Sequence, residues 1–139
     1  MNHGGFVLGR RDAETLGLAA QDLAGRAQAL VRFAEADPDL ALAAGVEVSA
    51  LEAKTILSSG APGRVAGAAA GIGRTGQAVI APADFQAIGR LEALLFSSDQ
   101  RLGQRMAQLD QARASSPYEN LGSMIGLATG AVGLLRSIF

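Results

Sequence analysis

The sequence predicts an all-α fold, namely an elongated helical protein with one long amphipathic helix and two glycine-ladder helices, packed in an oligomeric assembly. Aromatic residues make up only 4% of the 139 residues, whereas sandwiches and barrels need alternating runs of β-branched and aromatic residues. Leucines recur at seven-residue intervals in two segments, which is typical of amphipathic helices. Two other segments each carry a glycine ladder, defined here as three glycines spaced four residues apart. The length allows one domain with a modest core.

The N-terminal part is predicted to be a flexible arm over residues 1–11, followed by an acidic helical segment over residues 12–60. Within that segment, Leu16, Leu23 and Leu30 form one apolar stripe of a helix that runs to about residue 36. Asp37 before Pro38 then predicts an interruption, because a residue before proline disfavours the helical conformation.

The rest of the acidic segment is predicted from its capping signals. Gly45 should end a short helical piece, and "SALE" at residues 49–52 has the spacing of a capping box. A helix beginning there should end at Ser59, with Gly60 as its C-terminal cap. "APG" at residues 61–63 predicts a turn.

Charge is unevenly distributed along the chain. Residues 1–59 carry eight acidic and five basic side chains, which indicates a solvated acidic half. The net charge is −1, and nucleic-acid binding usually requires a concentrated basic face. We therefore expect no specific nucleic-acid partner.

The two glycine ladders are predicted to be helix-packing faces within residues 61–139. Glycine inside a helix costs roughly 1 kcal/mol relative to alanine, so a closely approaching neighbour should offset that cost. Packing in water, contact with a membrane and an accident of composition all stay open as explanations. The glycines are Gly63, Gly67 and Gly71 in the first ladder and Gly122, Gly126 and Gly130 in the second.

The long helix is predicted over residues 82–114, with Pro82 in its first turn. It carries an apolar stripe that needs a partner helix, in the same subunit or in another. We interpret this face as an oligomer stripe. Its residues are Phe85, Ile88, Leu91, Leu95, Leu102, Met106 and Leu109.

The C-terminal segment has sixteen uncharged residues from Asn120 to Leu135. As a helix it would measure about 24 Å, against roughly 30 Å of membrane hydrocarbon. This length is marginal for a permanent anchor and compatible with transient membrane contact.

The sequence offers few residues for catalysis. Cysteine is absent, and the single histidine, His3, lies in the predicted arm, so metal clusters and Ser/His/Asp triads are not expected. Gly71, Gly73 and Gly76 form G-x-G-x-x-G, but no β-branched strand precedes them, as a dinucleotide site requires. We predict a protein that is not an enzyme and uses no cofactor or metal.

Residues 61–139 resemble small internal virion proteins, or ejection proteins, of tailed bacteriophages. The resemblance lies in order and composition: a small-residue segment, the helix "DFQAIGRLEALLFSSDQRLGQRMAQLDQARA" and the tail "LGSMIGLATGAVGLL". The helix includes the apolar–Gly–x–Leu–acid–Ala–Leu element at residues 88–94. Before Gly60 the chain departs from this pattern, with a shorter acidic helix in place of a long basic one.

The resemblance implies a virion structural protein stored in the capsid interior or at the portal–tail junction. Such a protein leaves with the genome and helps to form a conduit across the host envelope. Its implied partners are copies of itself, portal, tail or other ejection proteins, and transiently the host membrane. Two alternatives stay open: a water-soluble structural subunit of another bacterial or phage assembly, such as a connector or rod, and a small helical partner-binding protein.

Overall fold

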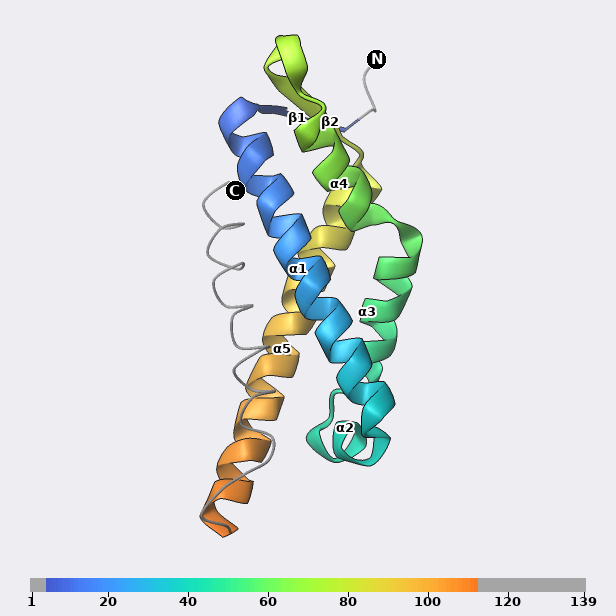
Figure 1. Ribbon diagram of the computed structural model, residues 1–139, viewed down its shortest axis with the longest axis vertical. Helices are drawn as coiled ribbons and strands as arrows, with labels where there is room; N and C mark the ends of the chain where they lie inside the picture. The colour runs from blue at the N-terminus through green and yellow to red at the C-terminus, as the bar shows by residue number, and fades with distance from the viewer. Residues whose placement is uncertain (1–4, 113–139) are drawn as a thin grey trace.

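The computed structural model describes residues 5–112, which form a mostly helical fold. The predicted helical class is confirmed, with the addition of a small antiparallel sheet. Within these residues there are five α-helices, two strands and one 3-10 turn (Figure 1). In chain order they are β1 (Phe6–Gly9), α1 (Arg10–Ala36), α2 (Pro38–Ala44), α3 (Glu47–Ser59), α4 (Ala61–Ala70), η1 (Gly73–Thr75), β2 (Gln77–Ile80) and α5 (Pro82–Ala112).

The two long helices, α1 and α5, define the elongated shape of the described part (Figure 1). α5 has 31 residues and therefore measures about 46 Å. α4 packs along the first half of α1, and α3 packs along its second half, with α2 at the lower end in Figure 1. The sheet lies at the opposite end, beside the start of α1.

The core is formed by the seven-residue stripe of α1 and by the stripe of α5. Leu16, Leu23 and Leu30 are fully buried, and they belong to one cluster with Leu91 and Leu95. The predicted stripe of α1 is therefore confirmed as the buried face of that helix.

α1 approaches α4 closely at Gly17. A Cβ atom added to Gly17 would lie 2.7 Å from the Cβ of Ala69. Because real Cβ atoms essentially never come so near, only glycine at position 17 permits this packing distance.

The sheet differs from the predicted flexible arm over residues 1–11. Residues 6–9 form β1, which pairs antiparallel with β2, so that Phe6 lies opposite Ile80 and Gly9 opposite Gln77. The ring of Phe6 also packs on the ring of Phe85, with 4.5 Å between the centroids. These partners are more than sixty residues away along the chain, which is why local patterning did not reveal the strand.

The helix boundaries follow most of the predicted caps. The side chain of Asp37 accepts a hydrogen bond of 3.1 Å from the Leu40 amide at the start of α2, as expected for a cap. Gly45 and Gly60, both with a positive φ, end α2 and α3 as predicted. α5 begins at Pro82, as predicted, and continues to Ala112, the last described residue, so the predicted boundary at residue 114 lies outside the described residues.

Two local predictions were wrong. α3 begins at Glu47, so Ser49 lies inside the helix and α3 has no side-chain cap. "APG" at residues 61–63 opens α4 instead of forming a turn. Pro62 is compatible with the first helical turn, where its missing N–H would have no intrahelical partner.

Candidate functional site: an apolar groove between α1, α2 and α3

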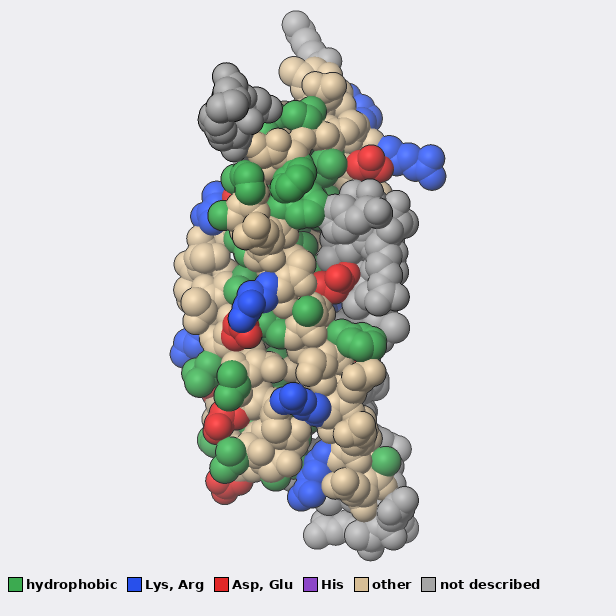
Figure 2. Space-filling view, turned by 180° about the vertical axis from the view of Figure 1, so that it is seen from behind, with side chains coloured by type: hydrophobic (Ala, Val, Ile, Leu, Met, Phe, Trp, Pro, Cys, Tyr) green, Lys and Arg blue, Asp and Glu red, His purple; other side chains and the backbone are tan. Residues whose placement is uncertain are grey.

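Several large apolar side chains are exposed in the described part of the molecule, and six of them fall into two groups. Figure 2 shows hydrophobic side chains near the upper end, at mid-height and toward the lower left of the molecule. Phe6, Val7 and Val79 belong to the sheet, whereas Leu42, Val48 and Leu51 belong to α2 and α3. Of the second group, Leu51 lines the groove described next.

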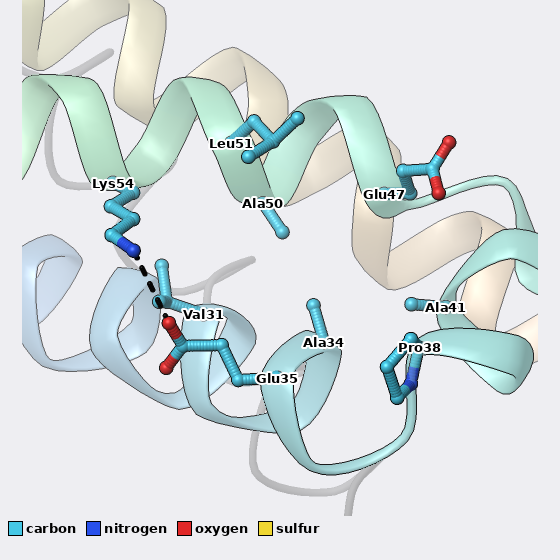
Figure 3. Close-up of a pocket in the computed structure, with 9 residues that line it drawn as sticks. All are labelled: Val31, Ala34, Glu35, Pro38, Ala41, Glu47, Ala50, Leu51 and Lys54. Atoms are coloured by element: carbon cyan, nitrogen blue, oxygen red, sulfur yellow. Dashed lines mark hydrogen bonds and ion pairs between the residues drawn. The ribbon is translucent and has the colours of Figure 1, made fainter.

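The groove is a cavity of about 230 Å³ between three helices (Figure 3). A cavity of roughly 150 Å³ can admit a molecule of the size of benzene, so this groove has room for an aliphatic side chain. Its lining residues are Val31, Ala34 and Glu35 from α1, Pro38 and Ala41 from α2, and Glu47, Ala50, Leu51 and Lys54 from α3.

The floor of the groove is made of alanines, and its α3 side carries the larger apolar side chain of Leu51. Ala34, Ala41 and Ala50 point into the gap in Figure 3. Leu51, which lines the groove, is 63% exposed, and Val48, one helical turn earlier, is 71% exposed. On α3, Ala50 at the floor of the recess is thus followed directly by the protruding Leu51.

The charged groups stand at the two ends of the groove. At one end Lys54 Nζ lies 3.3 Å from Glu35 Oε2, so an ion pair joins α3 to α1 (Figure 3). At the other end Glu47 occupies the first turn of α3, where the helix dipole favours a negative charge. A side chain that entered the groove would contact an apolar floor, with the ion-paired Lys54 at one end and the carboxylate of Glu47 at the other.

A second ionic contact lies outside the groove and joins α4 to α5. The guanidinium of Arg64 donates hydrogen bonds to the carboxylate of Asp84, with Nη2 2.8 Å from Oδ1, and to the carbonyl oxygen of Ser59 at 2.7 Å. The hydrogen bond to Asp84 raises the pKa of Arg64 above its ordinary value. This contact positions the start of α5 and satisfies a carbonyl at the end of α3.

The first glycine ladder lies on the exposed side of α4. Gly63 and Gly67 are exposed, and a Cβ added to either would have no neighbouring atom within 4 Å among the described residues. α4 ends at Ala70, so Gly71 stands just beyond the helix. The close approach to α1 uses Gly17 and Ala69 instead. The packing role of this ladder stays a prediction, and Gly122, Gly126 and Gly130 lie outside the described residues.

The predicted oligomer stripe of α5 is largely occupied within the chain itself. Ile88, Leu91, Leu95 and Leu102 are buried in the core shared with α1 and α3. Phe85 and Met106 are half-buried, and the side chain of Leu109 lies outside the described part. For the four buried residues the partner helix is thus in the same subunit, because their surfaces are already covered there.

The groove itself was not predicted from the sequence. Its alanines come from three helices, and no spacing of residues links Ala34, Ala41 and Ala50 before the helices are packed. Leu51 and Val48 offered a weak signal, since both are apolar residues beside the charged residues of α3. The G-x-G-x-x-G motif lies after α4 and leads into β2, with positive φ angles at Gly73 and Gly76.

Residues 5–112 contain no helix that is both long and apolar enough to cross a membrane. The same residues hold no cluster of three or more histidine, aspartate or glutamate side chains arranged for a metal ion. Comparisons with protein-family models, curated proteins and solved structures found no match to this chain.

Proposed function

We propose that this chain is a structural subunit, not an enzyme, of a tailed-bacteriophage particle, and that it works through apolar contacts with other protein chains. The observation that carries the proposal is the alanine-floored groove, which the exposed Leu51 lines on its α3 side, with the exposed Val48 one helical turn earlier on the same helix. The likeness of residues 61–139 to internal virion proteins supports the setting.

The groove favours a protein partner over a small polar ligand. Single exposed apolar residues are ordinary on a protein surface, but a group of them beside a recess is typical of interaction sites. The lining offers only two carboxylates and one lysine, of which Glu35 and Lys54 already pair. Apolar contact would therefore supply most of the attraction, as it does when a helix docks in a groove.

In this proposal the chain resides in the capsid interior or at the portal–tail region and contacts the host envelope after ejection. Its partners are its own copies together with portal, tail or other ejection proteins. Mass spectrometry of purified particles, produced by a strain that encodes the chain, should detect it. Its absence from the particles would contradict the proposal.

A substitution in the groove tests whether apolar docking is the basis of incorporation. Leu51→Asp should lower the amount of the chain per particle several-fold, because a carboxylate would be desolvated in an apolar contact. Leu18→Asp is the matched control, since Leu18 is 64% exposed on α1 and does not line the groove. Equal incorporation of both variants would show that the groove is not the docking site.

The groove also favours a second candidate function, a small helical protein that sequesters a partner helix. Such a protein would bind its target in solution and would be missing from particles. A water-soluble subunit of another assembly would differ from the phage proposal in liposome flotation, because it should stay unbound to vesicles.

A further inference from the structure

We infer that the groove is one half of a two-fold symmetric interface between two copies of this chain. α3 of each copy would lie antiparallel to α3 of the other, with each Leu51 entering the second copy's alanine-floored groove. The inference rests on the proposed function and deepens it, because it names the partner of the same site.

The shape of the surface is the first argument. A two-fold interface uses the same patch twice, so the patch must carry both a protrusion and a recess that receives it. Leu51 projects from α3 and is 63% exposed, and Ala50, the next residue, belongs to the recess. This surface therefore complements itself.

The order of charges along α3 is the second argument. Glu47 precedes Ala50 by three residues, and Lys54 follows Leu51 by three residues. A two-fold axis between Ala50 and Leu51 places Glu47 of each copy opposite Lys54 of the other. The same axis places each Leu51 opposite the second copy's Ala50, so one arrangement satisfies both charge and shape.

The parallel arrangement is disfavoured by the same residues. Two identical helices packed in parallel bring equal positions together, so that Glu47 would meet Glu47 and Lys54 would meet Lys54. Like charges at such positions repel, whereas the antiparallel pair joins opposite charges twice.

The ion pair within each chain is compatible with this contact. Lys54 and Glu35 are 59% and 60% exposed, and exposed ion pairs hold their side chains weakly. The ammonium group of Lys54, with its three donors, would be shared between Glu35 of its own chain and Glu47 of the second copy.

Charge reversal tests the register of the interface. The full chain should show a concentration-dependent dimer in sedimentation equilibrium, and Glu47→Lys or Lys54→Glu alone should raise the dissociation constant by at least about tenfold. The double variant Glu47→Lys/Lys54→Glu should restore the dimer. A mixture of the two single variants should give a 1:1 heterodimer, because each then meets opposite charges at both contacts.

Matched controls separate the interface from folding. Asp12→Lys changes an exposed acid in the first turn of α1, as Glu47→Lys does in α3. Arg32→Glu reverses an exposed cation that does not line the groove. Both should dimerise like the unmodified chain, and circular dichroism should show the same helix content in all variants.

Each outcome decides the inference. A chain that is monomeric at every concentration would overturn it, and so would a dimer that the single charge reversals do not weaken. A weakened dimer that the double variant does not restore would overturn the antiparallel register, even if the mixture restores it, because the two single variants would also join opposite charges in a parallel dimer. A monomeric chain that is nevertheless found in particles leaves the proposed function standing with another protein in the groove. A dimer that is absent from particles contradicts the proposed function alone.

Discussion

Gly17 and Gly25 lie two helical turns apart on α1 and have opposite surroundings. At Gly17 an added Cβ would meet the Cβ of Ala69 at 2.7 Å, whereas at Gly25 it would meet no described atom within 4 Å. Close packing therefore requires glycine at position 17, whereas no described neighbour requires it at position 25.

Gly17→Ala should therefore destabilise the fold and Gly25→Ala should stabilise it. Overpacking a tight helix contact typically costs about 1–3 kcal/mol, and alanine replaces glycine inside a helix with a gain of roughly 0.5–1 kcal/mol. Urea unfolding of both variants measures the two changes in the free energy of unfolding. Equal effects at the two positions would contradict the close approach of α1 to α4.

Asp99 on α5 gives an expected pH dependence. Burial raises the pKa of the Asp99 carboxyl above its ordinary value of 3.8, so the folded chain binds this proton more tightly than the unfolded chain. The free-energy cost of holding this carboxylate charged in the folded chain is therefore fully present above the raised pKa. It declines as the pH falls through that pKa and is absent below 3.8, where both states are protonated.

Asp99→Asn should consequently stabilise the chain at neutral pH. Partial exposure screens the charge, so we expect a gain below about 1 kcal/mol. Chemical denaturation of the variant and of the unmodified chain, at neutral pH and below 3.8, measures the difference. A gain of the same size at both pH values would contradict its electrostatic origin.

α4 presents two faces with different surroundings. One face packs on α1 through Val65 and Ala69, which are buried, whereas Gly63 and Gly67 lie exposed. The ladder therefore does nothing for packing within the described residues, and its glycines lower the helix stability of α4. The predicted role of the ladder, a contact with another helix, would then have to come from outside the described residues.

Gly67→Leu should separate helix stability from assembly. Both Gly67 and Gly89, its control on α5, are exposed and have no described atom within 4 Å of an added Cβ. Leucine at either position should raise the free energy of unfolding by up to about 1 kcal/mol. Only Gly67→Leu should also lower the amount of the chain in purified particles, measured by mass spectrometry. Equal incorporation would show that the ladder is not a packing face.

Helices were the elements that the sequence predicted best, because their signals are local. The stripe of α1, the break at Asp37 and Pro38, and the start of α5 at Pro82 each depend on neighbours within a few residues. The strand β1 was missed because its partners come from β2, far along the chain. α3 begins at Glu47, two residues before the predicted cap Ser49, so the capping signal at Ser49 did not set the start of this helix.

One hydrophobic core joins residues from α1 through α5. The stripe of α5 was predicted as an apolar face, but its burial against α1 and α3 depends on how three helices meet. For the same reason the groove was not predicted, since alanines leave a recess only where larger side chains hold the helices apart. The spacing of apolar residues in the sequence showed which helix faces are apolar, but it did not show which neighbouring element covers each face.

The pairing of β1 with β2 also bears on the order of folding during synthesis. Phe6 leaves the ribosome long before Ile80, its partner across the sheet, and contacts of high sequence separation form slowly. α1 therefore emerges with its buried leucines still uncovered, and they are fully covered only when α3, α4 and α5 have all been made. The first strand of the chain is among the last segments to be fixed, and the nascent N-terminal half depends on being kept from other chains in the meantime.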